Sequence, residues 1–160
     1  MAYGFRTPTL ADMPMLRRWL NTPEVVRWWG DPVEQEALLW DDLGNALMTM
    51  RIVSFEDRPF AYAQDYDVWS WPQPQFADLP PGARAIDAFI GEPDMIGRGH
   101  GSAFLRELAL RLVAEGAPVV AIDPDAGNLR ARRAYARAGF VGDAVVQTPD
   151  GPAVVMRFES

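Results

Sequence analysis

The sequence predicts a mixed α/β domain with a mostly antiparallel sheet, a central parallel strand pair and flanking helices. Three observations predict it: helical apolar spacing in the first third, β-rich runs that read as hairpins, and a strand, a helix and a buried strand in succession near the centre. A strand–helix–strand order implies a parallel pair joined by a right-handed crossover. With 160 residues, the chain is expected to form one domain over residues 1–160.

The first third of the chain is expected to be mostly helical. A short strand at residues 5–7 precedes a capped helix over residues 9–20, whose apolar residues return at helical spacing. One more helical turn is expected at residues 24–30. Asp31-Pro32 then starts a second amphipathic helix, which Gly44 ends.

Two β-rich runs in the middle of the chain are expected to pair as a hairpin. Residues 47–55 and 60–69 are rich in β-branched and aromatic residues and are separated by Glu56-Asp-Arg-Pro59. Residues 70–83 contain four prolines, which preclude regular structure, and long ordered loops of this kind are often functional. Residues 84–90 form the next strand.

The second half of the chain alternates helices and strands. A helix over residues 103–113 leads to a continuous apolar strand at residues 119–122, which is expected to be buried on both faces. A second helix runs from its cap at Asn128 to Gly139. Residues 140–147 and 153–158 are expected to form a closing hairpin around a Thr-Pro-Asp-Gly-Pro turn.

Composition narrows the class of function. The net charge is −7, with 22 acidic residues against 15 basic ones, which argues against nucleic acid as a partner and favours a cationic small molecule. The chain has no cysteine and one histidine, so disulfides, a cysteine nucleophile and a metal site are not expected. No apolar run is long enough to span a membrane and no signal peptide is recognised, so we expect a soluble cytoplasmic protein.

Residues 94–102, Asp-Met-Ile-Gly-Arg-Gly-His-Gly-Ser, form a glycine loop that opens the helix over residues 103–113. Glycine lets a ligand approach the backbone, the first-turn amides point toward the loop, and the helix dipole and Arg98 add positive charge, so the loop predicts a pocket for phosphate oxygens. The dinucleotide fingerprint is excluded because Ser102 stands where it needs glycine, and a Walker loop is excluded because the chain has no lysine. The candidate binding residues are Gly97, Arg98, Gly99, His100, Gly101 and Ser102.

The order of motifs around this loop resembles the GNAT acetyltransferase superfamily. Residues 96–101 are similar to its Arg/Gln-x-x-Gly-x-Gly/Ala loop, with Ile96 in place of the polar first residue. Asn128 and Tyr135 follow at distances typical of the superfamily. The resemblance covers nearly the whole chain and implies a GNAT-like fold with acetyl-coenzyme A (acetyl-CoA) as the cofactor. The arginines between residues 130 and 137 could then steer the coenzyme's anionic end, or form a solvated helix face.

Within that superfamily the chain resembles most the bacterial aminoglycoside 6'-N-acetyltransferases. The residues that carry this resemblance include Trp19-Leu-Asn21, Val26-Arg-Trp-Trp-Gly30, Ala85-Ile-Asp87 and Thr148-Pro-Asp-Gly-Pro-Ala-Val154. The resemblance implies direct acetyl transfer to the 6'-amino group of an aminoglycoside. Two alternatives stay open: a related branch that acetylates siderophore hydroxylamines or other small amines, and a coenzyme-binding module without catalysis.

Five residues are given roles in the reaction by this resemblance. An ammonium must lose its proton before it attacks, and the family's proposed base falls on Asp87, which could instead be a solvated carboxylate at a strand end. Tyr135 matches the hydroxyl donor to the leaving thiolate, or is a core tyrosine with a paired hydroxyl. Asn128 matches a coenzyme contact, although a helix cap alone would explain it. Backbone amides near Phe89 and Ile90 are expected to hold the acetyl oxygen.

Recognition of a polycation requires several carboxylates. Besides Asp87, Asp123 and Asp150 match acceptor-binding aspartates of the resembled family, although each could simply shape the turn in which it lies. For Trp29, packing in the core is at least as good an explanation as contact with a ligand. A monomer and a homodimer are both compatible with the sequence. The tryptophans that could form an apolar wall for sugar rings are Trp28, Trp29, Trp69 and Trp71.

Overall fold

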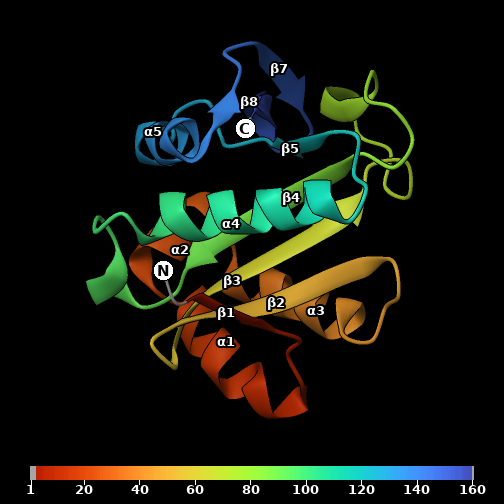
Figure 1. Cartoon of the computed structure of the whole chain (residues 1–160). Coiled ribbons are helices and arrows are strands. Elements are labelled where there is room, and N and C mark those ends of the chain that lie inside the picture. Colours follow the sequence, from red (N-terminus) through yellow and green to blue (C-terminus); the bar gives the residue numbers. More distant parts are fainter. Residues whose placement is uncertain (1–2, 160) are drawn as a thin grey trace. The chain divides into compact units, whose positions relative to one another are not determined.

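The computed structural model describes residues 3–159 and divides the chain into two compact units. Unit 1 contains the described residues up to Gln64 together with Ala88–Arg98, and unit 2 contains Asp65–Asp87 together with the described residues from Gly99 onward. Figure 1 labels the elements along the chain. The strands hydrogen bond in the order β1-β2-β3-β4-β5-β9-β6, with β7 and β8 in a separate two-stranded sheet. The predicted mixed α/β class is therefore confirmed.

Unit 1 opens with a strand and a series of short helices, as the sequence predicts. β1 (Tyr3–Arg6) pairs antiparallel with β2 (Met48–Phe55). Between them lie the 3₁₀ turn η1 (Leu10–Asp12), α1 (Met13–Leu20), α2 (Pro23–Trp29) and α3 (Pro32–Asp42). Asp31 caps α3 by accepting a hydrogen bond from the amide of Glu34 at 3.2 Å, and Pro32 fits the first turn because its missing N–H is not needed there.

The core of unit 1 is built around the buried ring of Trp19. Its ring meets that of Phe89 edge to face, with centroids 6.3 Å apart, and its Nε1 donates to Glu92 Oε2 at 2.8 Å. Gly91 lies against this ring, and a Cβ at that position would overlap it. The close approach explains why the chain carries glycine there although the backbone φ does not demand it.

The predicted hairpin after α3 is present, with a tighter turn than expected. Only two residues, Glu56 and Asp57, separate the end of β2 from the start of β3 (Arg58–Asp67) and form the turn. Both have positive φ, 49° and 66°, which is the geometry of the two-residue turns that match strand twist. The sequence prediction places all four residues from Glu56 to Pro59 between the strands, whereas Arg58 and Pro59 belong to β3.

Unit 2 holds the parallel strand pair that the sequence predicts. β4 (Arg84–Ile90) begins in it, and β4 pairs parallel with β5 (Val120–Ile122) in the register Arg84↔Val120, Ala85↔Ala121 and Ile86↔Ile122. α4 (His100–Ala114) precedes β5, and α5 (Leu129–Ala138) follows it and contacts α4. α5 starts at Asn128, whose Oδ1 accepts from the amide of Ala131 at 3.2 Å, and ends at Gly139 in the left-handed conformation.

The closing segment differs from the single hairpin that the sequence predicts. Four short strands replace it: β6 (Phe140–Val141), β7 (Val145–Thr148), β8 (Gly151–Val154) and β9 (Met156–Phe158). β7 pairs with β8, whereas β9 lies between β5 and β6. Gly142 has φ +150°, and a Cβ there would overlap the carbonyl oxygen of Val155, so the chain bends between the two pairs.

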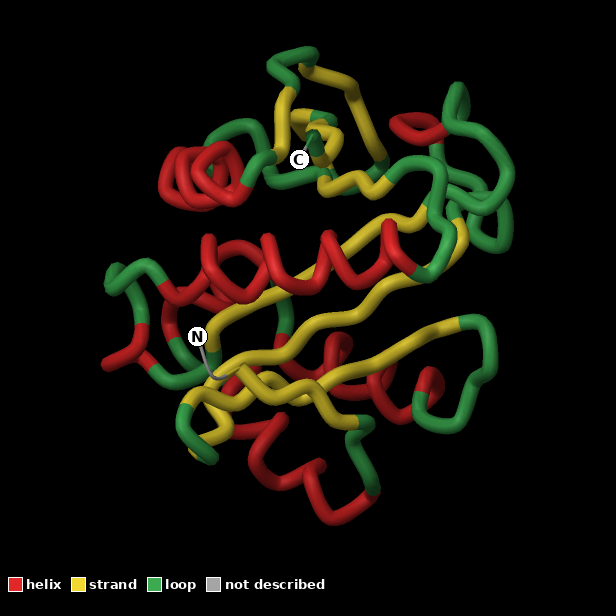
Figure 2. The backbone as a smooth tube through the Cα atoms, viewed as in Figure 1, coloured by secondary structure: helices red, strands yellow, loops and turns green. Residues whose placement is uncertain are grey.

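The long connection between β3 and β4 is ordered but mostly irregular, as its prolines predict. Figure 2 shows it as an extended loop with one short helical turn. That turn is η2 (Pro74–Phe76), in which Gln75 and Phe76 are buried. A similar turn, η3 (Pro93–Met95), follows β4 in unit 1. Among residues 3–159, no helix is long and apolar enough to cross a membrane.

Candidate functional site

Two carboxylates come directly after the paired residues of the parallel strands: Asp87 lies within β4, and Asp123 follows the last residue of β5. Ile86 of β4 lies beside Ile122 of β5, and the next residues along the two strands are Asp87 and Asp123. Because Ile86 and Ile122 are register partners, the residues that follow them bring the two aspartates side by side. Each side chain is partly buried. The sequence predicted both residues for the site but did not predict that the register makes them neighbours.

Asp150 joins this pair through the small β7–β8 sheet. The amide of Ala126 donates to the carbonyl of Pro152 at 3.0 Å, and the amide of Val154 donates to the carbonyl of Pro124 at 2.9 Å. These bonds tie the segment after Asp123 to β8, which begins one residue after Asp150. The charge of Asp150 acts on Asp123. Three predicted aspartates therefore lie in one acidic cluster, defined here as Asp87, Asp123 and Asp150.

The protonation of Asp123 is strongly perturbed. Burial, together with the neighbouring charges of Asp87 and Asp150, raises the pKa of this carboxyl from its usual 3.8 to about 7, although a hydrogen bond from Gln75 acts to lower it. Close to neutral pH, the acidic cluster therefore holds a proton that a bound cation would displace. Such a site favours an ammonium ligand.

Three residues that the sequence reasoning did not single out are bonded to this cluster. Gln75 Nε2 donates to Asp123 Oδ2 at 2.9 Å and to Gln73 Oε1 at 3.0 Å, and Gln73 Nε2 donates to the hydroxyl oxygen of Tyr66 at 2.8 Å. Burial raises the pKa of Tyr66, and the charges of Asp87 and Asp123 add to this effect. The sequence predicts that the proline-rich loop at residues 70–83 is functional, but it does not indicate which residues of the loop take part.

Tyr135 belongs to the same electrostatic environment. Its ring meets that of Phe140 edge to face, with centroids 6.4 Å apart. Burial raises the pKa of its hydroxyl, and the charges of Asp87 and Asp123 raise it further, so the hydroxyl stays protonated at any physiological pH. A protonated hydroxyl within electrostatic reach of two carboxylates can act as a hydrogen-bond donor or as a general acid.

The glycine loop has the backbone geometry that a close ligand requires. Gly97 and Gly99 are left-handed, with φ of +76° and +86°, and a Cβ at either position would meet no atom within 4 Å. The open space on the backbone is what an approaching phosphate needs. α4 starts at His100, three residues earlier than predicted, so Gly101 and Ser102 lie in its first turn with their amides directed to its N-terminal end. Arg98 is exposed.

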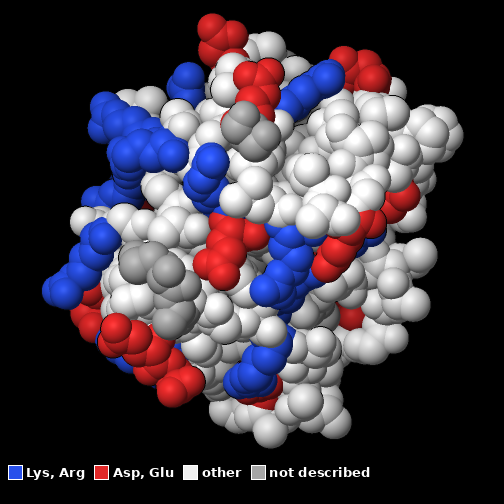
Figure 3. Space-filling view, viewed as in Figure 1, with Lys and Arg blue, Asp and Glu red and all other residues white. Residues whose placement is uncertain are grey.

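Two predicted coenzyme-binding side chains have structural partners. Ser102 Oγ donates to the carbonyl of Ala134 at 2.9 Å and joins α4 to α5, and Asn128 caps α5. The side chain of Asn128 keeps its Nδ2 group for other contacts, whereas the hydroxyl proton of Ser102 is used. Figure 3 shows basic side chains gathered over α5, and the arginines of that helix with exposed side chains are Arg130, Arg133 and Arg137.

The candidate residues of unit 1 mainly pack against neighbouring side chains. The ring of Trp29 meets Phe89 edge to face at 4.9 Å and Tyr62 at 6.3 Å. Trp28 lies under the guanidinium of Arg27, 4.8 Å from the ring centroid. Phe89 is in the core cluster of unit 1, and Ile90 ends β4. Trp29 and Phe89 are therefore core residues of unit 1.

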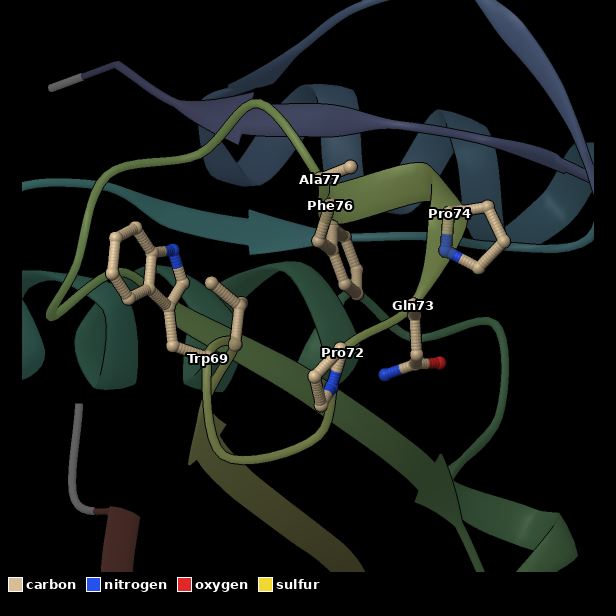
Figure 4. A pocket seen from close by; sticks show the side chains of 7 residues that line it. Trp69, Pro72, Gln73, Pro74, Phe76 and Ala77 are labelled. Carbon is tan, nitrogen blue, oxygen red and sulfur yellow. The ribbon is translucent and has the colours of Figure 1, made fainter.

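An open groove of about 490 Å³ lies in the loop of unit 2. Figure 4 shows the rings of Trp69 and Phe76 facing it, and Gln73 on the stretch that enters η2. Trp69 is 60% exposed, and its Nε1 donates to the carbonyl of Leu79 at 3.0 Å, which fixes the ring. The groove is connected to the acidic cluster by the bonded glutamines. Its lining residues are Val68, Trp69, Pro72, Gln73, Pro74, Phe76 and Ala77.

The chain matches a known protein family over most of its length. Residues 9–148 match the model of the acetyltransferase (GNAT) domain. The chain belongs to the GNAT acetyltransferase family. The predicted GNAT-like sheet with its parallel pair is thus confirmed by the family match as well as by the strand order. In residues 3–159, no group of three or more histidine, aspartate or glutamate side chains is arranged to hold a metal ion.

Similar GNAT proteins are named for aminoglycosides. The chain is 36% identical over 166 residues to the aminoglycoside N(6')-acetyltransferase type 1 of Klebsiella pneumoniae, a match that covers 94% of this chain and 80% of that protein. It is 42% identical over 78 residues to a kanamycin resistance protein of Rhizobium radiobacter, which covers 48% of this chain and 71% of the relative.

Solved GNAT structures of aminoglycoside acetyltransferases are also similar. The acetyltransferase AAC(6')-Ib in complex with coenzyme A and kanamycin has a TM-score of 0.85 and 33% identity, and the match covers 98% of this chain and 94% of that one. The same enzyme in complex with paromomycin and acetyl-CoA has a TM-score of 0.86 and 31% identity, and the match covers 99% of this chain and 93% of that one.

Proposed function

We propose that this GNAT protein transfers the acetyl group of acetyl-CoA to the 6'-amino group of an aminoglycoside. The observation that carries the proposal is the acidic cluster: three carboxylates, one of them with a pKa raised to about 7, beside a protonated tyrosine in unit 2. The similarity to proteins named aminoglycoside N(6')-acetyltransferases supports the same acceptor.

The acidic cluster suits an acceptor that arrives as an ammonium ion. Asp87 binds the ammonium and takes its proton, directly or through a water molecule, so that the nitrogen lone pair is free to attack. Asp123 and Asp150 bind further ammonium groups of the same polycation through charge-assisted hydrogen bonds. A bound cation lowers the pKa of Asp123, so acceptor binding releases a proton near neutral pH.

Tyr135 is assigned to the departing sulfur. Its raised pKa keeps the hydroxyl protonated, so it can donate a hydrogen bond or a proton to a thiolate as negative charge develops there. Its neighbours Asp87 and Asp123 would disfavour a tyrosinate, which helps Tyr135 to recover a proton after each turnover.

The N-terminus of α4 fits the coenzyme's phosphates. When bound, acetyl-CoA supplies an acetyl group activated as a thioester. The left-handed Gly99 and the first-turn amides of Gly101 and Ser102 offer donors to phosphate oxygens, and the exposed Arg98 adds charge. The exposed arginines of α5 attract the same polyanion at longer range. Because Ile96 offers no polar contact, backbone amides and Arg98 must supply the phosphate contacts.

The proposal is tested by the release of free thiol from acetyl-CoA. Purified protein is incubated with kanamycin, tobramycin, N-hydroxyornithine or N-hydroxylysine in separate reactions. Turnover with the two aminoglycosides is expected. Turnover with the hydroxylamines alone contradicts the proposed acceptor, and no turnover with any of the four, despite measured coenzyme binding, contradicts an acetyltransferase of small amines.

Asp87→Asn tests the assigned base. The amide keeps the size of the side chain but cannot take a proton, so kcat should fall by roughly 10²- to 10⁴-fold while the affinity for coenzyme A is unchanged. Asp78→Asn is the matched control, because Asp78 is an exposed aspartate of the same unit whose partner is the exposed Arg157. Equal kcat values for the two variants would remove Asp87 as the base.

A further inference from the structure

We propose that Gln75 is a positioning residue for acceptor recognition, because its buried amide donates to Asp123 and thereby holds that carboxylate ionised and oriented for a cation. This inference rests on the proposed function, since it concerns the acceptor site of the same reaction. Gln75 is 6% exposed and lies in the turn η2. Its Nε2 group bridges Asp123 Oδ2 at 2.9 Å and Gln73 Oε1 at 3.0 Å.

The orientation of the Gln75 amide depends on an oxygen acceptor at Asp123. When Asp123 is ionised, rotating the amide by half a turn would place Oε1 against Asp123 Oδ2 and Gln73 Oε1 with no proton between the oxygens. The observed orientation avoids this and fits an ionised Asp123. Gln73 is held in turn by its donation to Tyr66, so the loop presents Nε2 of Gln75 to Asp123 in a fixed position.

The other end of the same amide indicates a functional rather than a stabilising role. Gln75 Oε1 is buried and accepts no hydrogen bond from any residue of the described chain. A buried acceptor without a partner destabilises the fold, and an apolar side chain of similar size would remove that cost. The need for the Nε2 donor at Asp123 explains why the chain keeps a glutamine here despite its unpaired Oε1.

Gln75 is the side-chain donor to Asp123, whose own backbone amide also lowers its pKa. Asp87 within β4 and Asp150 beside β8 both favour the protonated form of Asp123 through their charge. Tyr66 and Tyr135 are protonated neighbours that carry no charge. The Gln75 hydrogen bond opposes burial and the two carboxylates, and it lowers the pKa of Asp123. Without Gln75, Asp123 should bind a cation only at higher pH.

The test compares Gln75→Leu with the wild-type protein in the dependence of KM for kanamycin on pH. We expect KM to rise by about tenfold near neutral pH, which is the effect of losing a hydrogen bond to a charged group, and to approach the wild-type value near pH 9. The KM for acetyl-CoA should not change. The amines of kanamycin titrate equally in the reactions of the variant and of the wild-type protein. The ratio of the variant KM to the wild-type KM therefore reports the titration of the protein alone.

Two further variants keep the test decisive. Gln147→Leu is the matched control: it removes an exposed amide of β7 in the same unit and leaves the Gln75–Asp123 bond, so its KM ratio should stay constant with pH. Gln75→Glu keeps the shape of the side chain, serves if Gln75→Leu does not fold, and should move the acidic limb of kcat/KM to still higher pH because a second carboxyl faces Asp123.

The outcomes separate this inference from the proposed function. A KM ratio for Gln75→Leu that is constant with pH, or one matched by Gln147→Leu, overturns the positioning role while wild-type turnover leaves the proposed function standing. A wild-type protein that acetylates no aminoglycoside overturns the proposed function and the inference together.

Discussion

Asp123→Asn should stabilise the protein more at alkaline than at mildly acidic pH. The wild-type carboxyl has its pKa raised from 3.8 to about 7 in the folded state, mainly by burial, so the folded state holds this proton more tightly than the unfolded chain does. The folded state is then the one that binds more protons between these two values. Stability contributed by Asp123 therefore falls as pH rises from about 4 to about 7.

The magnitude follows from the two pKa values. Integrating the linkage relation gives a penalty of about 2 kcal/mol at pH 5.5 and about 4 kcal/mol at pH 8.5, so the expected difference is about 2 kcal/mol. An asparagine carries no charge, can accept the hydrogen bond from Gln75 in place of the carboxylate, and removes this penalty at both pH values.

The assay is urea unfolding followed by tryptophan fluorescence, for both proteins at both pH values. The lower pH stays above the sequence pI of about 4.6, which keeps the protein charged and soluble. The free energy of unfolding of Asp123→Asn, relative to wild type, should rise by about 2 kcal/mol between the two conditions. An equal difference at both pH values would refute the assignment of the raised pKa to Asp123.

Three more substitutions test other parts of the structure. Tyr135→Phe should lower kcat by roughly 10²-fold with little change in KM for the acceptor, measured by thiol release, and an unchanged kcat would remove the hydroxyl from the reaction. Gly91→Ala should lower the free energy of unfolding by about 1–3 kcal/mol in urea titrations, because the added methyl group overlaps the Trp19 ring, and a neutral result would contradict the packing around that ring. Arg98→Ala should raise KM for acetyl-CoA several-fold at low salt and less at high salt, and a salt-independent effect would argue against a charge contact with phosphate.

Most of the fold could be predicted from the sequence, because its elements carry local signals. Asp31-Pro32 and Asn128 mark helix starts through their capping chemistry, and β4 was predicted with the bounds that the structure gives. The closing hairpin was wrong in its connectivity. Its strands are short, and the close approach of Gly142 to Val155 between them is a contact without a signature in the local sequence.

The acidic cluster was predicted as residues but not as an arrangement. Asp87 and Asp123 are neighbours because the register aligns Ile86 with Ile122, and a register of parallel strands cannot be read from the sequence of either strand. Gln75 was missed for a related reason: its role depends on the path of a proline-rich loop, which places a buried amide beside Asp123. Trp29 was left between two interpretations, and its ring contacts favour the core.

The most direct test of the proposed reaction is to determine where the acetyl group goes. Kanamycin is incubated with the protein and acetyl-CoA, and the product is analysed by mass spectrometry and two-dimensional NMR. The proposal predicts a singly acetylated product with the new amide on the 6'-nitrogen. Unmodified kanamycin, or an acetyl group on a different nitrogen, would contradict it.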